Sequence, residues 1–220
     1  MSGGRLTPLQ GRILRLLSAL EPPWTLTGGA ALVGFHLKHR TTKDLDLFWH
    51  ERQQLGSLPQ ETQARLTAEG LEVTAVQTSP TFHRLRVKDG PEVCIVDLVA
   101  EPVSAVHRPQ TVEIQGVSIT VDSPQEILVN KLCTLLSRSE VRDLVDVRAL
   151  LESGADLKGA LADAPRKDAG FSPLVLAWVL RDLRPRPLAE AAGLSEAEAE
   201  DLDRFREKLI SVLLEAGAPE

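Results

Sequence analysis

Cysteine is scarce in this chain of 220 residues, and its two copies, Cys94 and Cys133, lie far apart. Neither belongs to a CxxC pair or a Cys/His cluster, the patterns typical of zinc sites and redox-active disulfides. Cys94 lies in an apolar run and Cys133 in a stretch with helical spacing. We therefore expect two reduced thiols in the core and no disulfide framework.

Long apolar runs are also missing. Nowhere do about 18 apolar residues follow one another, which is the length that a membrane-spanning helix needs. The apolar core of a signal peptide is interrupted, within the first twenty residues, by Gly3, Gly4, Arg5, Gln10 and Arg15. We expect a cytoplasmic protein with no membrane association.

Aromatic residues and positive charge are both in short supply. The chain has no Tyr, three Trp and five Phe, and its formal net charge is -6. So few rings argue against a long track for single-stranded RNA, where bases stack on aromatic side chains. The acidic balance means that any polynucleotide must be bound by a local basic patch. The acidic balance argues against constitutive coating of nucleic acid.

Apolar residues, by contrast, make up 43% of the chain, enough for the core of one large domain or of a domain with a small appendage. Helical spacing of apolar residues occurs at 6–20, 28–38, 58–68, 124–137, 140–152, 173–183 and 195–216. Strand-like runs occur at 24–26, 44–49, 71–77, 82–88, 92–99 and 112–121. This order predicts an α/β (α+β) fold, with a core at 1–122, a helical C-terminal region at 123–220 and a linker at 158–170.

Two acids alternate on the strand expected at 44–49. Residues two apart on a strand point to the same face, so Asp44 and Asp46 present their carboxylates together while Leu45 and Leu47 enter the core. Adjacent carboxylates repel each other unless a cation lies between them, and hard oxygen ligands suit Mg²⁺ or Mn²⁺. The sequence therefore predicts a divalent-cation site.

A glycine pair precedes these acids. Gly28 and Gly29 open a helix that Thr27 is expected to cap. Bare backbone N–H groups at a helix N-terminus attract phosphate oxygens. With Asp44 and Asp46, the pair indicates metal-assisted chemistry on a nucleotide, although a simple tight turn stays open as the alternative.

Asp97 is a third acid of interest. It shares one face of its strand with Ile95 and Val99, and a carboxylate among apolar neighbours needs a counter-ion or hydrogen bonds. Asp97 either completes a metal site or is a structural acid paired with Arg84 or Arg86.

Three segments of the chain match a known family. They read Gly-Gly-Ala-Ala-Leu at 28–32, His-Arg-Thr-Thr-Lys-Asp-Leu-Asp-Leu-Phe at 39–48, and Lys-Leu-Cys-Thr-Leu-Leu-Ser-Arg-Ser-Glu-Val-Arg-Asp-Leu-Val-Asp at 131–146. In these segments the chain resembles the nucleotidyltransferase AbiEii/AbiGii toxin family of the polymerase-beta-like nucleotidyltransferase superfamily. The resemblance covers residues 24–151 and implies a polymerase-beta-like nucleotidyltransferase core with a small mixed sheet.

For the acids, the resemblance implies metal binding. Asp44, Asp46 and Asp97 would hold Mg²⁺ or Mn²⁺, and two such ions would stabilise the entering and leaving oxygens. Asp143 and Asp146 occupy the acidic positions of the family's last motif. The general base is either Asp97 or one of these two, and the spacing does not decide between them.

For the nucleotide, the resemblance implies contacts with its phosphates. The positions expected to make them are Thr27, Gly28, Gly29, Arg40, Lys131 and Arg138. Relatives often have threonine where Ala30 stands, so Thr27 or backbone groups would replace that hydroxyl. Two structural alternatives stay open, a Lys131 side chain that extends to solvent and ordinary helix-surface ion pairs at 138–146.

The implied reaction transfers NMP from NTP to a hydroxyl and releases pyrophosphate. Toxins of the resembled family are antagonised by a cognate antitoxin and some modify the 3′ end of tRNA, so RNA and an antitoxin protein are expected partners. A basic surface for RNA would come from Arg84, Arg86, Lys88 and Arg108, or from Arg181, Arg184 and Arg186.

Two alternative functions remain. One is transfer to a small cationic molecule, as in antibiotic nucleotidyltransferases, which the net charge of -6 slightly favours. The other is a non-catalytic descendant that binds a nucleotide or a partner protein, against which the intact set Asp44, Asp46 and Asp97 argues.

Overall fold

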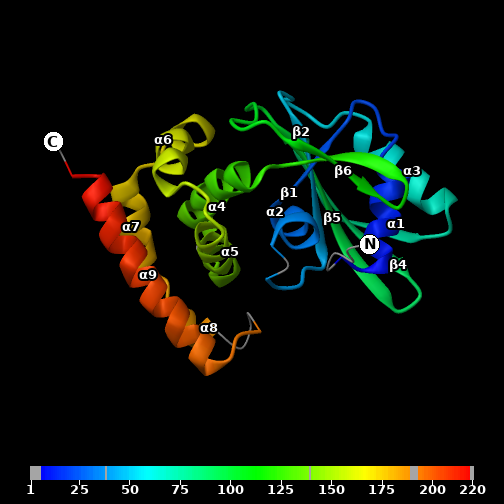
Figure 1. The fold of residues 1–220 in the computed structure, drawn as a ribbon. Coiled ribbons are helices and arrows are strands. Elements are labelled where there is room, and N and C mark those ends of the chain that lie inside the picture. Colours follow the sequence, from blue (N-terminus) through cyan, green and yellow to red (C-terminus); the bar gives the residue numbers. More distant parts are fainter. Residues whose placement is uncertain (1–5, 38, 139, 189–192, 219–220) are drawn as a thin grey trace. The chain divides into compact units, whose positions relative to one another are not determined.

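A mixed sheet dominates the N-terminal half of the protein. The structure, a computed structural model, describes residues 6–37, 39–138, 140–188 and 193–218. The chain divides into two compact units, Met1–Ser123 and Pro124–Glu220. Figure 1 shows the sheet with its helices in the first unit and the helices of the second. The mixed α/β class that the sequence predicts is confirmed.

The strands follow the sequence prediction to within a few residues. They are β1 (Thr25–Thr27), β2 (Asp44–His50), β3 (Glu72–Thr78), β4 (Phe82–Asp89), β5 (Glu92–Glu101), β6 (Gln110–Ile114) and β7 (Val117–Val121). Their order in the sheet is β3-β4-β5-β2-β1-β7-β6. The pairs β2–β5 and β1–β7 are parallel, and the other neighbours are antiparallel.

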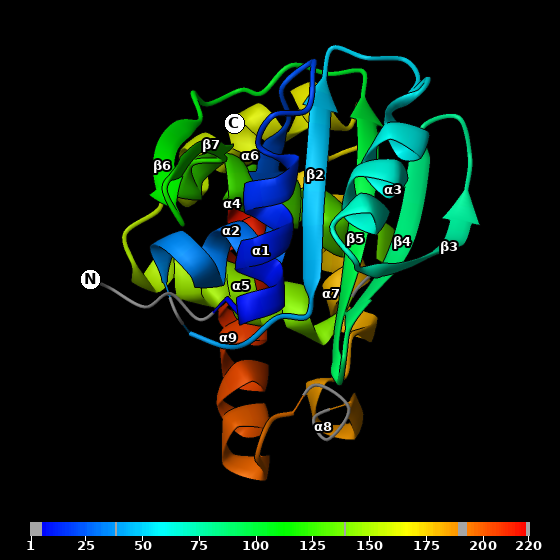
Figure 2. The same ribbon diagram turned by 90° about the vertical axis from the view of Figure 1, so that its right-hand side faces the viewer.

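The two faces of the sheet differ. Helices α1 (Pro8–Leu17) and α3 (Leu58–Ala68) lie on the same face (Figure 2). Leu45 and Leu47 of β2 are fully buried, as their alternation with acids predicts. Burial of each such side chain contributes about 1.5–3 kcal/mol, so this pattern fixes which face of β2 enters the core. The acids of β2 consequently point to the opposite face.

The segment after β1 departs from the single helix expected at 28–38. It forms a short α-helix, α2 (Gly28–Ala31), followed by a π-helical turn, η1 (Leu32–His36). The N–H of Leu37 donates to the carbonyl oxygen of Leu32 at 2.8 Å, an i→i+5 bond. Thr27 stands at the N-cap position, but its hydroxyl accepts no capping hydrogen bond. The positive φ of Gly28, +63°, turns the chain out of regular helix geometry at that point, so the predicted side-chain cap is wrong.

The described part of the second unit consists of helices and their connections. These helices are α4 (Pro124–Arg138), α5 (Val141–Glu152), α6 (Leu157–Lys167), α7 (Pro173–Asp182), α8 (Pro185–Leu188) and α9 (Glu196–Ala216). Among all described helices, none combines the length and apolar character that crossing a bilayer requires.

The linker expected at 158–170 is wrong, because most of that segment is α6. Its Ala160, Leu161 and Ala164 are buried at helical spacing, and α6 packs against α4. Lys167 Nζ also lies 2.5 Å from Glu126 Oε1 of α4 in a buried ion pair. The Ala, Asp, Lys and Pro composition that indicated a linker belongs to a helix whose small residues form its packed face.

Candidate functional site

The strand register brings four of the predicted site residues to one face of the sheet. Asp46 of β2 lies opposite Asp97 of β5, and Thr27 of β1 lies opposite Asp46. Side chains at paired positions of neighbouring strands point to the same face. Asp44, two residues before Asp46, belongs to this face as well. The first unit therefore gathers three carboxylates and one hydroxyl on the face that α1 and α3 leave uncovered.

The two glycines let charged groups approach the backbone closely. A Cβ on Gly28 would overlap Oδ2 of Asp46, and a Cβ on Gly29 would lie 2.7 Å from Nη2 of Arg40. Gly28 also has φ +63°, a left-handed conformation that favours glycine. This turn is thus shaped around one carboxylate and one guanidinium, which a simple tight turn does not require.

Thr27 supplies a polar atom that lacks a protein partner. Thr27 is 3% exposed, and its hydroxyl oxygen, Oγ1, is buried without a hydrogen bond. A buried hydroxyl without a partner is unfavourable, and such exceptions in a folded protein call for an explanation such as a ligand. Thr27 shares the face of Asp46 and directly precedes the glycine turn.

Asp97 already has a counter-ion in the first unit. Arg84 of β4 donates from Nε to Oδ1 at 2.8 Å and from Nη2 to Oδ2 at 2.7 Å. The hydrogen bond to Asp97 raises the pKa of Arg84, and the charges of Asp97, Asp44 and Asp46 add to this effect against the opposing effect of burial. Of the two partners that the sequence allowed for Asp97, Arg84 forms the pair, whereas Arg86 lies opposite Ile95.

The donor set suits a divalent cation. Asp44, Asp46 and Asp97 are hard oxygen donors on adjacent strands, as Mg²⁺ and Mn²⁺ prefer. In the described residues, however, no three His, Cys, Asp or Glu side chains converge closely enough to hold a metal ion. Asp44 and Asp46 are the candidate ligands for such an ion, and the positive charge of Arg84, which bonds both oxygens of Asp97, opposes the approach of a cation to that carboxylate.

Lys131, Asp143 and Asp146 form a second cluster, which belongs to the helical unit. Lys131 Nζ of α4 lies 2.7 Å from Asp143 Oδ1 and 2.8 Å from Asp146 Oδ2 of α5. All three residues are buried. Arg138 donates from Nε to Asp143 Oδ2 at 2.9 Å and from Nη2 to Oδ1 at 3.1 Å. Lys131 therefore does not extend to solvent, and these residues link two helices instead of decorating a helix surface.

The charges in this cluster hold one another ionised. Burial alone would lower the pKa of Lys131, but the carboxylates of Asp146 and Asp143 outweigh it and raise the pKa. Burial likewise works to raise the pKa of Asp143, and hydrogen bonds and charge from Arg138 and Lys131 overcome it and lower the pKa. The cluster is thus a fully compensated set of buried charges.

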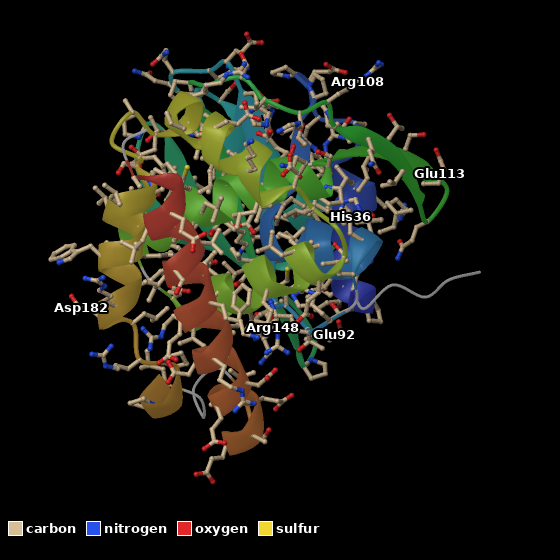
Figure 3. All side chains as sticks on the ribbon, turned by 60° about the vertical axis from the view of Figure 1, so that its left-hand side comes forward. His36, Glu92, Arg108, Glu113, Arg148 and Asp182 are labelled. Carbon is tan, nitrogen blue, oxygen red and sulfur yellow. The ribbon has the colours of Figure 1, made fainter. Side chains whose placement is uncertain are left out.

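The basic candidates for an RNA surface belong to both units. Arg86, Arg108, Arg181 and Arg184 are exposed, and Lys88 pairs with Glu72 at 3.1 Å. The side chain of Arg186 lies outside the described residues. Arg108, labelled in Figure 3, lies on the connection between β5 and β6, whereas Arg181 lies near the end of α7 in the second unit.

The sequence left the partner of Asp97 open between Arg84 and Arg86, although the strand register decides between them. The dipeptide Asp89-Gly90, between the strand-like runs at 82–88 and 92–99, is typical of a hairpin turn, and in the structure Asp89 pairs with Glu92. Counting back along both strands from that pair places Arg84 opposite Asp97. The hairpin register, taken further, would have identified this ion pair.

Comparisons with known proteins bear on both units. The family model described as "Nucleotidyl transferase AbiEii toxin, Type IV TA system" matches residues 12–216. None of the curated protein sequences compared with the chain matches it. The family match thus runs through the sheet and the helical unit alike.

Solved structures share the fold at low sequence identity. JHP933 from Helicobacter pylori is 18% identical with a TM-score of 0.53, covering 92% of this chain and 89% of that protein. A candidate nucleotidyltransferase from the same bacterium is 20% identical with a TM-score of 0.52, covering 97% and 100%. An antigenic nucleotidyltransferase-like protein from Paracoccidioides brasiliensis is 19% identical with a TM-score of 0.51, covering 83% and 88%.

Proposed function

The chain belongs to the AbiEii nucleotidyltransferase toxin family, and from this premise we propose that it transfers NMP from NTP to a hydroxyl acceptor. The observation that carries the proposal is the shared face of Asp44, Asp46 and Asp97 beside the glycine turn. The acids suit the cation of a nucleotide, and the turn suits its phosphates.

Each part of this face has a role in the proposal. Asp44 and Asp46 hold Mg²⁺ or Mn²⁺, with Asp97 as a third ligand, and the ion neutralises charge on the triphosphate. The Gly28 and Gly29 backbone and the Thr27 hydroxyl bind phosphate oxygens. Arg40, whose guanidinium lies against Gly29, adds positive charge at the same turn.

The proposed reaction forms one bond and breaks another. The acceptor oxygen attacks the α-phosphorus, the bond from that phosphorus to the bridging oxygen of the β-phosphate breaks, and pyrophosphate leaves. The acceptor's proton goes to a carboxylate, for which Asp97 is the candidate in the first unit. Asp143 and Asp146 stay alternatives on the family resemblance, as do phosphate contacts from Lys131 and Arg138.

The acceptor and partners follow from the family in this proposal. A type IV toxin–antitoxin family supports an RNA acceptor, such as a tRNA 3′ end, and a cognate antitoxin protein. The net charge of -6 favours a small cationic acceptor instead. We keep RNA as the first candidate and the small cation as the second.

Calorimetric titration of Mn²⁺ and each NTP into the protein tests the nucleotide site. We expect metal-dependent NTP binding in the wild type and none in Asp44→Asn/Asp46→Asn, whose shape is preserved. Glu61→Gln/Glu69→Gln, two exposed acids of α3 and its C-terminal end, removes the same charge elsewhere and should bind like the wild type. No binding by the wild type would contradict the proposal and favour a non-catalytic, partner-binding descendant.

Incubation with radiolabelled NTP then identifies the acceptor. Label that moves to tRNA, and not to small cationic molecules, supports the RNA acceptor. Label on the small molecules alone would replace it with the second candidate.

A further inference from the structure

The ion pair between Arg84 and Asp97 occupies a candidate metal ligand. Two hydrogen bonds, at 2.8 and 2.7 Å, engage both oxygens of the carboxylate. Paired in this bidentate way, a guanidinium and a carboxylate form one of the stronger polar contacts in proteins. In this conformation, a cation and Arg84 therefore compete for the same oxygens.

We propose that Arg84 is a positioning residue that holds Asp97 until cation and nucleotide bind together. The inference rests on the proposed nucleotidyltransfer. When both ligands bind, Arg84 releases Asp97 to the cation and turns to the phosphate oxygens of the nucleotide. Arg84 thus makes the binding of cation and nucleotide cooperative.

The burial of the two partners shows which one moves. The side chain of Asp97 is 8% exposed and that of Arg84 is 40% exposed. Asp97 is short and lies within β5 between two paired strands. Arg84 has a long side chain, and its guanidinium also lies 5.4 Å from the ring centroid of Phe82, over which a cation is attracted. The guanidinium can swing while Asp97 stays in place.

The charges explain why a cation alone meets resistance. The acids of β2, Asp44 and Asp46, also act on Arg84 through their charge. A cation that takes Asp97 as a ligand without a nucleotide must displace this resident positive charge from the Asp97 carboxylate. A triphosphate gives the guanidinium a new anionic partner, so each ligand favours the other by the same factor.

Arg86 offers a matched control on the same strand. It lies two residues from Arg84, on the same face, and carries the same charge. Its opposite residue on β5 is Ile95 and not an acid. Loss of Arg86 therefore changes the local charge without releasing Asp97.

The test measures Mn²⁺ affinity by calorimetry with and without a non-hydrolysable NTP, beside thermal unfolding of each variant. We expect Arg84→Met to bind Mn²⁺ alone about tenfold more tightly and to lose most of the cooperativity with nucleotide. Arg86→Met should stay close to the wild type in both respects. Equal effects of the two substitutions would indicate a general charge effect and overturn the inference.

A second variant shows whether the gain depends on Asp97. Arg84→Met/Asp97→Asn leaves neither partner charged, so it also guards against misfolding caused by an unpaired carboxylate. We expect it to return Mn²⁺ affinity to the wild-type value. Tight Mn²⁺ binding by this double variant would overturn the role of Asp97.

The wild type distinguishes failure of this inference from failure of the proposed function. If the wild type binds no Mn²⁺ in the presence of NTP, the proposed function itself is contradicted. If the wild type binds both ligands and Arg84→Met has no effect, only this inference is contradicted.

Discussion

Gly28 is a position at which the candidate site cannot accommodate a side chain without displacing Asp46. A methyl group there meets Asp46, and the backbone has φ +63°. Gly56 has nearly the same angle, +62°, with nothing within 4 Å of a built Cβ. The two positions therefore separate backbone strain from contact with the carboxylate.

We expect Gly28→Ala and Gly56→Ala to lower the free energy of unfolding by a similar strain of roughly 1–2 kcal/mol. Only Gly28→Ala also displaces the Asp46 carboxylate, so it alone should lose metal-dependent NTP binding. Urea denaturation and calorimetry measure the two effects. Intact NTP binding by Gly28→Ala would show that the turn does not shape the site.

The sequence predicted the acids of the candidate site better than the partners of those acids. Alternation on β2 is a local property, so the common face of Asp44 and Asp46 followed from spacing alone. The partner of Asp97 and the missing cap at Thr27 depend on strand register and on one positive φ. Neither feature follows from single residues. The partner of Asp97 could nevertheless have been found by extending the strand register from the hairpin at Asp89-Gly90.

Among the helices, α4 and α5 are joined by a buried set of charges. Lys131 is the cation shared by Asp143 and Asp146, and all three are nearly inaccessible to water. Removing one partner from a buried pair leaves an uncompensated charge, which is far more costly than losing a surface ion pair.

Lys131→Met should therefore lower the free energy of unfolding by roughly 3–5 kcal/mol. Lys158→Met, at an exposed position of α6, should change it by about 0.5 kcal/mol or less. Chemical denaturation compares the two variants. If Lys131→Met is as stable as Lys158→Met, the cluster does not stabilise the helical unit, and a direct role with the triphosphate gains weight.

Elements with clear periodicity were predicted well, and the exceptions have physical causes. Helix α3 begins and ends where the sequence placed it, because Gly70 with φ +83° follows its end. Helix α6 was missed because alanines form its buried face and hide the apolar pattern. The π turn η1 was missed because its extra residue breaks the helical spacing.

On the scale of the whole molecule, two histidines link stability to pH. Burial lowers the pKa of His83 and of His36, for which it outweighs a hydrogen bond to the carbonyl oxygen of Asp122. As the pH falls, the two histidines bind protons near pH 6.5 in the unfolded chain and only at lower pH in the folded protein. The contribution of these two histidines to stability is therefore fully present above about pH 6.5 and is lost as the pH falls through their lower pKa values in the folded state.

We expect the free energy of unfolding, measured by urea denaturation from pH 7.5 to 5, to decrease as the pH falls below about 6.5, because the unfolded chain binds protons at both histidines before the folded chain does. His83→Phe, which keeps a ring at this buried site, should flatten that slope. Asp143, whose pKa is lowered from 3.8, loses its contribution only at more acidic pH. A slope that stays unchanged in His83→Phe would contradict the assignment.

The family match extends what the sequence alone suggested about the molecule as a whole. The motif resemblance ended near residue 151, whereas the family model reaches residue 216. The motifs consist of residues expected to take part in the chemistry. The last helices carry packing residues instead, and their apolar pattern is shared by many helical proteins, so it does not identify the family. The neighbouring position of β2 and β5 was likewise expected from the family, since spacing along one chain does not fix strand order.

The π turn between the glycines and the acids has a consequence for evolutionary comparison. A turn closed by Leu37 and Leu32 holds one residue more than an α-helical turn. A homologue with an uninterrupted α-helix here would reach the counterpart of Asp44 one residue sooner. Alignments anchored on Gly28 therefore need a single-residue gap within residues 32–36, and a fixed-length motif search would overlook such homologues.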